Sequence, residues 1–432
     1  MDRVSSLPDS LLFEILLNLP TKDVVRTSLL SSRWRNLWRD VHGLDLEYDD
    51  FREHDAFGSF IDAFLSFNRD SCIRNLKLMY HWNHAGVSDV KRWINTVVRR
   101  TIQHLHVKDI SWCGPCGPKV QIHPTLYTSE SLVSLHLCNV ALTDLKFVYL
   151  PCLKAIVLNM ASFLGHSALE TLTQAARLDI ERSLVLRVRS QYLLSFNIVA
   201  DSSDDDYSNS SDDDYDDDPV VVIDAPRLQY LRLWDNRAAR FILNNIGSLV
   251  KADIDTVFDD KYDSNDIQKR NMVCDFLFGI SRVKYMIIAS ATLEVIYDHS
   301  RREPLPLFQN LSFLHVKFGG FSWEMLPIFL ERCPNLKSLV VGSITDREEK
   351  VGIYFLPLPR CSLASLEYVE IERPFKGESL EMELVSYLLE NSPILKKLIL
   401  CLDGSEQKQD SVILKKLISI PKLSTSCQVV VL

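Results

Sequence analysis

The segment MDRVSSLPDSLLFEILLNLPTKDVVRTSLLSSRWRNLWRDVHGLDL, residues 1–46, carries more apolar side chains than a small helical domain can bury. Between Ser10 and Leu19 the apolar residues recur at the four-residue spacing of a helix. A surface helix needs an apolar arc of roughly 100° to cover its own core, and two adjoining stripes exceed that arc. We therefore expect a partner to cover part of this surface. The stripes are Leu11, Ile15 and Leu19, and Leu12 and Leu16, with the Phe13–Leu17 pair beside them.

Prolines and capping residues divide this segment into three predicted short helices. Pro8 suits the first turn of the first helix, and Pro20 ends it because proline lacks an amide donor. Thr21 is the predicted N-cap of the second helix, and Ser31 or Ser32 that of the third. Such short helices bury little apolar surface, so we expect a partner; an ordinary helical cap on a larger domain is the alternative. The third helix would align Trp34, Leu37, Trp38 and Val41 on one face.

The same residues resemble an F-box, the helical motif that docks onto the Skp-type adaptor of cullin-based ubiquitin ligases. The resemblance rests on the Leu-Pro-Asp start, the Ile-Leu pair, the Leu-Pro turn, the Asp-Val-Val run and the Arg-Trp-Arg-x-Leu-Trp end. It implies a core-like interface anchored by large aliphatic and aromatic groups. The adaptor-facing residues that the resemblance implies are Leu7, Pro8, Leu12, Ile15, Leu16, Leu19, Pro20, Val24, Val25, Leu30, Trp34, Leu37 and Trp38.

A second pattern, apolar-x-x-apolar-x-apolar, recurs through the rest of the chain, often at intervals of 21 to 30 residues. This interval is typical of leucine-rich repeats, in which the end of the pattern forms a short strand and the preceding leucine packs beneath it. The clear copies start at Ile73, Ile102, Leu132, Leu153, Leu193, Leu228, Val283, Leu311, Leu336, Leu366 and Leu395, and weaker ones at Ala175 and Leu249.

Two late copies, LERCPNLKSLVV from Leu330 and LENSPILKKLIL from Leu389, nearly superimpose. Each follows a helix-like lead and contains a proline turn before the strand, so one supersecondary unit is repeated and needs neighbours to bury its apolar edge. An ordinary α/β sheet with leucine-rich strands is the alternative. The chain has just 14 glycines and no phosphate-loop signature, which favours the repeat array.

The whole chain resembles the plant F-box/FBD/leucine-rich-repeat proteins, on segments such as VKRWINTVVRR, VVIDAPRLQYLRL and SLASLEYVEI. The resemblance implies an α/β fold class: a three-helix F-box over residues 1–46, an irregular leucine-rich-repeat solenoid over residues 47–355 and an αβ unit, the FBD region, over residues 356–432. One repeat departs from the family's pattern, because the usual Cys-Pro turn is missing near Gln174–Val188.

The net charge of −9 comes from one tract, Asp201–Asp218, which contains ten aspartates and no basic residue. The remaining 47 acidic and 48 basic residues are balanced, so the composition gives no case for nucleic-acid binding. We expect the tract to be a solvated, disordered insertion, because like charges at this density repel one another.

The motif Trp112-Cys113-Gly114-Pro115-Cys116 matches the thioredoxin redox motif letter for letter. That chemistry needs the first cysteine at a helix N-terminus, and Gly117-Pro118 opposes a helix here, so we interpret the match as coincidence. A disulfide reductase is retained as the alternative that an insulin-reduction assay would detect. The ten cysteines are scattered and favour a reduced, cytoplasmic or nuclear protein. No catalytic motif, metal site or cofactor site is predicted.

The resemblance implies a non-catalytic substrate-recognition subunit of a Skp–cullin–F-box ubiquitin ligase. The F-box would bind the adaptor, and through it a cullin, while the repeats would bind an unknown target protein. An F-box scaffold that acts outside a ligase is the alternative. No apolar run is long enough to span a membrane. Candidate side chains for the target-binding face are His136, Val157, Arg232 and His315.

Overall fold

A computed structural model of the chain describes most of its residues in two compact units, Met1–Asp217 and Asp218–Leu432. The thioredoxin-like motif at Trp112–Cys116, the acidic tract at Asp201–Asp218 and most of the irregular repeat near Gln174–Val188 lie outside the described residues. The structure describes residues 4–51, 54–67, 72–81, 85–111, 120–122, 124–142, 150–159, 162–163, 185–199, 220–234, 240–256, 258, 265–317, 326–342, 363–377, 379–402 and 407–432.

The first unit begins with two α-helices, α1 (Asp9–Leu17) and α2 (Thr21–Arg26). Two 3₁₀ turns follow, η1 (Thr27–Leu29) and η2 (Leu37–Asp40). Together they enclose a small apolar core, which the second stripe of α1 supplies in part. The core consists of Leu12, Leu16, Val24, Trp34, Leu37 and Val41, with Leu7, Phe13, Leu17 and Trp38 packed against it.

The predicted third helix is wrong, because turns and the short η2 replace it. Tertiary contacts hold this stretch in place. Arg33 donates to the carbonyl oxygens of Ser5 and Leu7 and pairs with Asp9 at 2.8 Å, and Trp34 Nε1 donates to Ser5 Oγ at 2.7 Å. These bonds join residues 5–9 to residues 33–34, and serine-rich sequence offers little helix propensity to oppose them.

The predicted N-cap at Thr21 is also wrong. Pro20 occupies the cap position of α2, and Thr21 is the first helical residue. The Thr21 hydroxyl instead accepts a hydrogen bond from the Asp45 amide at 2.8 Å. This partly buried bond ties α2 to the first strand of the sheet that follows.

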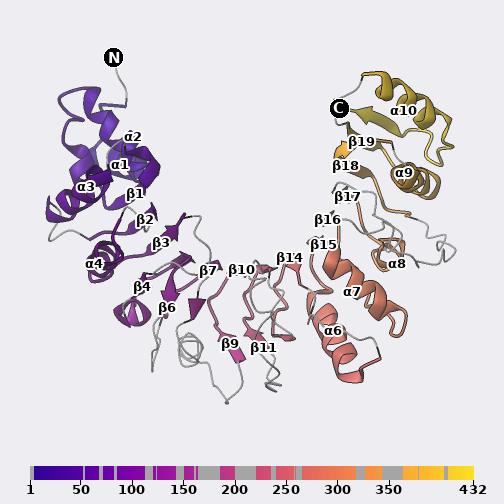
Figure 1. The fold of residues 1–432 in the computed structure, drawn as a ribbon, viewed down its shortest axis with the longest axis horizontal. Coiled ribbons are helices and arrows are strands. Elements are labelled where there is room, and N and C mark those ends of the chain that lie inside the picture. Colours follow the sequence, from indigo (N-terminus) through magenta and orange to yellow (C-terminus); the bar gives the residue numbers. More distant parts are fainter. Residues whose placement is uncertain are drawn as a thin grey trace, which may run out of the picture. The chain divides into compact units, whose positions relative to one another are not determined.

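Six parallel strands form the main sheet of the first unit, in the order of the chain. Apolar and polar residues alternate along them, so that one face is buried and the other carries half-buried side chains. Helices α3 and α4 lie on one side of the first strands (Figure 1). The strands are β1 (Gly43–Glu47), β2 (Asn75–Tyr80), β3 (His104–Asp109), β5 (Ser134–Cys138), β7 (Ala155–Asn159) and β10 (Ser195–Val199).

The connections between these strands change along the chain. After β1 and β2 they are the helices α3 (His54–Phe67) and α4 (Val87–Val98). Later connections carry short strands, three of which form a second parallel sheet. The remaining elements are η3 (Tyr48–Asp50), β4 (Gln121–Ile122), η4 (Pro124–Thr128), β6 (Ala141–Leu142), β8 (Ser162–Phe163) and β9 (Val185–Arg189).

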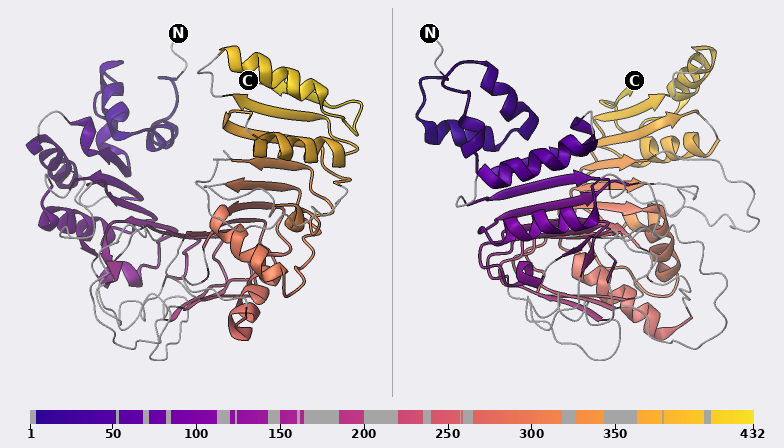
Figure 2. Two further views of the ribbon diagram at one scale, coloured as in Figure 1. Left: turned by 45° about the vertical axis from the view of Figure 1, so that its right-hand side comes forward. Right: turned by 60° about the vertical axis from the view of Figure 1, so that its left-hand side comes forward.

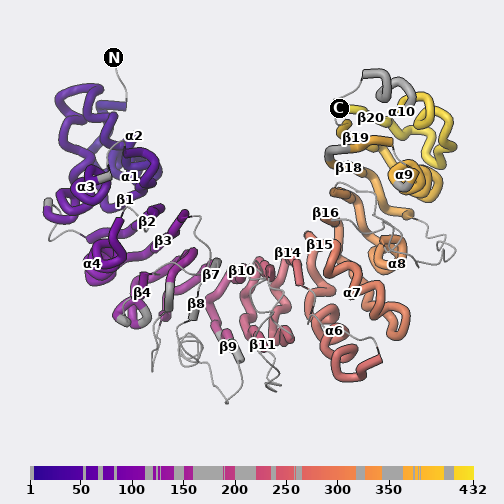
Figure 3. The backbone as a smooth tube through the Cα atoms, in the orientation of Figure 1, coloured from indigo at the N-terminus to yellow at the C-terminus, as the bar shows by residue number. Residues whose placement is uncertain are grey.

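The second unit repeats this design with eight parallel strands in chain order. Figure 3 traces the backbone through them, and Figure 2 shows α9 and α10 running alongside the last strands. The strands are β12 (Tyr230–Trp234), β14 (Lys251–Asp255), β15 (Tyr285–Ala289), β16 (Phe313–Lys317), β17 (Ser338–Val341), β18 (Tyr368–Phe375), β19 (Lys397–Leu402) and β20 (Gln428–Val431).

The connections of the second unit begin with a pair of short parallel strands and continue with helices. Helices α8 and α9 belong to the two repeats that nearly superimpose in sequence. These elements are β11 (Val220–Asp224), β13 (Arg240–Asn244), α6 (Ile267–Ile280), α7 (Ser290–Ser300), α8 (Leu326–Leu330), α9 (Ser379–Asn391) and α10 (Gln407–Ser419).

The repeat pattern predicted these strands correctly. Each of the eleven clear copies contributes a strand to one of the two main parallel ladders, and so does the weaker copy at Leu249. The apolar residue that opens each clear copy is buried, and Leu132, Leu311 and Leu395 have no exposed surface. The copy at Ala175 lies outside the described residues, and β1 and β20 were not predicted.

Candidate functional site

The implied adaptor-facing residues of the first unit divide into an inner and an outer set. Five are buried in the core of the helical segment, so they hold the shape of its surface and offer no side chain to a partner in this conformation. The others are at least partly accessible. The buried residues are Leu12, Leu16, Val24, Trp34 and Leu37; the half-buried ones are Leu7, Val25 and Trp38; the exposed ones are Pro8, Ile15, Leu19, Pro20 and Leu30.

The exposed apolar surface of this segment is larger than the implied set. Ile15 and Leu19 lie on the outer face of α1 with Leu11, which is 50% exposed. Leu29 and Leu30, at the end of η1, are 86% and 68% exposed. The family resemblance missed Leu11 and Leu29, although the four-residue stripe through Leu11, Ile15 and Leu19 marks the outer face of α1. We call these five residues the outer aliphatic set.

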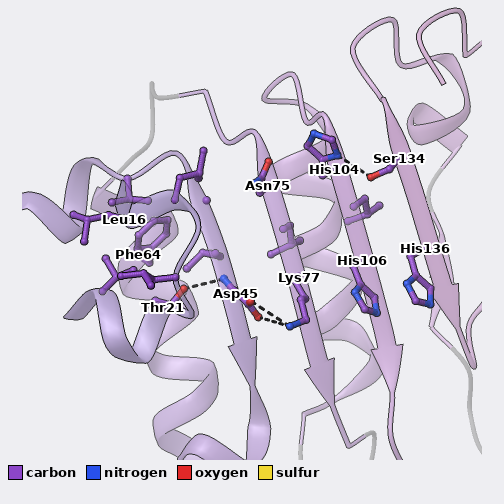
Figure 4. A pocket seen from close by; sticks show the side chains of 18 of the residues that line it. Leu16, Thr21, Asp45, Phe64, Asn75, Lys77, His104, His106, Ser134 and His136 are labelled. Carbon is purple, nitrogen blue, oxygen red and sulfur yellow. Dashed lines mark hydrogen bonds and ion pairs between the residues drawn. The ribbon is translucent and has the colours of Figure 1, made fainter. Parts of the chain in front are cut away.

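A hollow of about 390 Å³ lies beside the helical segment, within the first unit (Figure 4). Side chains of α1 and α2 form one wall, and the strands β1, β2, β3, β5 and β7 form the other. On the floor of the hollow, Lys77 forms an ion pair with Asp45 at 3.1 Å. The Thr21 hydroxyl accepts a hydrogen bond from the Asp45 amide. The floor therefore has polar groups that are already fixed in position.

Two stacked histidines extend this floor. His106 and His136 are register partners on β3 and β5, with ring centroids 3.9 Å apart and planes inclined by 10°. Burial, which has the largest effect, lowers the pKa of His106 to about 4 together with His136, Lys77 and Lys108. Burial and then Lys108 also lower the pKa of His136. Both rings are therefore neutral at pH 7, and their Nε2 atoms make no hydrogen bond to the described residues.

The equivalent face of the second unit carries a charged and aromatic cluster. Asp253, 6% exposed, accepts a hydrogen bond from Trp234 Nε1 at 3.1 Å and lies 3.4 Å from Arg232 Nε. The Arg232 guanidinium carbon lies 4.0 Å from the Trp234 ring centroid, and Lys317 Nζ lies 4.5 Å from it. Burial raises the pKa of Asp255, although the nearby positive charge of Lys317 acts to lower it. The cluster is held in one arrangement by its own contacts.

The candidate target-face residues occupy the predicted positions. His136, Val157, Arg232 and His315 are half-buried and alternate with buried leucine, isoleucine and valine side chains. Their role in binding a target stays a prediction. Among the described residues, no group of histidine, cysteine or acidic side chains could hold a metal ion. No helix in the described part of the chain is long and apolar enough to cross a membrane.

Comparison with known proteins matches the helical segment, residues 4–45, to the F-box domain and residues 356–400 to the FBD family. An F-box/FBD/LRR-repeat protein of Arabidopsis thaliana, At1g78750, is 53% identical over 455 aligned positions, which cover 100% of this chain and 96% of the relative. The chain belongs to the plant F-box/FBD/LRR-repeat family.

Other members of the family align equally completely. F-box/LRR-repeat protein 13 of Arabidopsis thaliana is 55% identical, and the FBD-associated F-box protein At4g13985 is 50% identical. Both alignments cover 100% of this chain and 96% of the relative. F-box proteins are generally non-catalytic receptors of Skp–cullin–F-box ubiquitin ligases, and F-box domains generally bind Skp1-type adaptors. The FBD match contains β18 and α9; the predicted extension of the FBD region to residue 432 stays a prediction.

Proposed function

We propose that this chain is a substrate-recognition subunit of a Skp–cullin–F-box ubiquitin ligase. Its F-box binds the adaptor, and the polar strand faces bind a target protein that is then ubiquitinated. The observation that carries the proposal is the division of apolar residues in the F-box. Its core is complete without a partner, yet the outer aliphatic set remains exposed on α1 and η1.

Exposed aliphatic groups on a domain with a sealed core indicate a docking surface. Full burial of a leucine or isoleucine side chain stabilises by about 1.5–3 kcal/mol, and these five side chains are already partly covered, so each contributes less. Five such groups together still suffice as the anchors of a specific interface, in which a few residues carry most of the binding energy.

The proposed mechanism is proximity. We propose that the parallel strand repeats form a leucine-rich-repeat solenoid that holds the target while the F-box fixes the receptor on the ligase. The target's lysines then meet the conjugating enzyme at a high effective concentration. The bond-forming chemistry belongs to other subunits, so this chain supplies only binding surfaces.

The test is co-expression of the full chain with a plant Skp-type adaptor, followed by measurement of complex formation. Ile15→Asp should abolish the complex, because it places a charge on the outer face of α1 without entering the core. Ile418→Asp, at an 81% exposed position of α10, is the matched control and should bind normally. Equal binding by both variants would refute the docking surface.

Cullin recruitment distinguishes a ligase receptor from an F-box scaffold that acts outside a ligase. A ligase receptor should bring a cullin into the complex through the adaptor, and a purified complex with conjugating enzyme should then transfer ubiquitin. A stable adaptor complex that never recruits cullin would favour the scaffold.

A further inference from the structure

The strand register of the second unit aligns one row of side chains at the beginning of its parallel strands. Because residues in register lie side by side and alternate residues share a face, this row belongs to the same face as Arg232 and His315. In register order the row is Tyr230, Lys251, Tyr285, Phe313, Ser338, Tyr368 and Lys397.

Lysines also precede several of these strands. Lys284, Lys337 and Lys396 are exposed at the residue before β15, β17 and β19. With Lys251 and Lys397 they make five lysines. Glu367 is the one acidic residue at these positions, and it pairs with Lys396 Nζ at 2.6 Å, which leaves four of the lysines without an acidic partner at these positions. We call the seven-residue row and these three preceding lysines the basic ledge.

Aromatic rings on the ledge are accessible and lie close to its lysines. Tyr285 and Tyr368 are each 46% exposed. Lys396 Nζ lies 5.8 Å from the centroid of the Tyr368 ring, and Lys251 Nζ lies 5.1 Å from that of Tyr230. A cation beside an aromatic ring offers a combined site for a carboxylate and an apolar or aromatic side chain.

The first unit has no such ledge at the same row. There the register partners are Gly43, Asn75, His104, Ser134, Ala155 and Ser195, which include neither a lysine nor a large aromatic ring. The residues before these strands add two basic side chains, Arg74 and Lys154, and no aromatic ring other than His42. The basic ledge is therefore a property of the second unit and does not follow from the repeat pattern.

We propose that the basic ledge binds an extended, carboxylate-rich segment of the target protein, with aromatic residues among its acidic ones. The proposal rests on the proposed function, because it names the kind of target segment the receptor recognises. Seven strands at about 4.8 Å spacing make a row about 29 Å long. An extended chain of about nine residues, at roughly 3.3 Å per residue, spans that length.

The type of basic residue indicates the type of anion. The ledge uses lysine, a compact point charge, and has no arginine, whose planar fork pairs best with phosphate. Lysines spaced along a row suit single carboxylates spaced along a peptide. Attraction between such exposed charges weakens with salt, so the binding should fall as ionic strength rises.

The probe for this proposal is a fluorescein-labelled nonapeptide in which glutamate and tyrosine alternate, measured by anisotropy with the full chain at low salt. We expect saturable binding, and none when glutamine replaces glutamate. The double variant Lys284→Glu with Lys337→Glu should weaken binding by about tenfold or more, because like charges then face each other. Tyr285→Ala should weaken it without changing its salt dependence.

The matched control is Lys415→Glu with Lys416→Glu, which makes the same charge change at exposed positions of α10 and should bind as the unaltered chain does. Equal loss in both double variants, or no binding at all, would overturn the proposal. Binding that appears only after the ten aspartates of Asp201–Asp218 become asparagine would assign the ledge to the chain's own acidic tract and would also overturn it.

Adaptor binding measured on the same samples separates the two levels of inference. A chain that binds the adaptor but not the peptide refutes the ledge alone. A chain that binds the peptide but no adaptor refutes the receptor function and leaves the ledge as a peptide-binding surface.

Discussion

Leu16→Ala should loosen the F-box, whereas Leu30→Ala should leave its stability unchanged. Leu16 is 1% exposed within the core that Leu12, Val24 and Trp34 help to form, and Leu30 is 68% exposed. Truncating a leucine in such a core costs about 2–5 kcal/mol through lost burial and the cavity left behind. Truncating an exposed leucine costs about 0.5 kcal/mol or less.

Hydrogen exchange of the α1 amides measures this difference without requiring the whole chain to unfold in one step. A cost of about 2.7 kcal/mol is a hundredfold rise in the opening equilibrium of α1, so its amides should exchange about a hundredfold faster in Leu16→Ala. In adaptor titrations Leu30→Ala should weaken binding by loss of contact. Unchanged α1 protection in Leu16→Ala, or equal acceleration in Leu30→Ala, would refute the division into an inner core and an outer aliphatic set.

Three further predictions concern Thr292, Gly377 and His106. Thr292→Val should destabilise the second unit by about 1–3 kcal/mol in urea unfolding, and Thr292→Ser much less, because Thr292 Oγ1 bonds both the amide and the carbonyl of Thr256 at 2.8 Å. Gly377→Ala should cost about 1–2 kcal/mol, because its φ is +72° and a Cβ would lie 2.6 Å from Ile413; Gly247→Ala, with open space around it, should be neutral. Acidification from pH 6.5 to pH 4 should destabilise the first unit, and less so in His106→Gln. The folded pKa of His106, about 4, lies below its ordinary 6.5, so the unfolded chain binds more protons in that window; equal acid sensitivity in both proteins would contradict this.

The strands were predictable because their cause is local. An apolar residue at every second position buries one face of a strand, and a further buried apolar residue precedes it, so the pattern alone predicts β3, β5 and β16. The missing third helix was not predictable from the same residues. Side-chain hydrogen bonds from Arg33 and Trp34 to Ser5 hold this stretch of backbone in its turns. These partners lie far apart in the sequence, so no local pattern predicts the contacts.

The docking residues show the same limit. The family resemblance named Leu12 and Ile15 alike, although one is fully buried and the other is 43% exposed. A match to a motif position indicates that a residue is needed for the fold or for an interface. The match does not distinguish a core residue from an interface residue. The side of α1 that faces the core depends on where α2 and η2 pack against it, so the three-dimensional arrangement was needed to separate the two sets.

The alternation of buried and accessible residues along each strand has an evolutionary consequence. Every position of the seven-residue row in the basic ledge comes from a different strand, and the residue that follows it in sequence is buried. Selection can therefore exchange Ser338 for a charged residue, or Tyr285 for a small one, without disturbing the packing that keeps the ladder folded. Such a surface can drift toward new partners one site at a time, which lets duplicated genes acquire distinct targets while their framework stays the same.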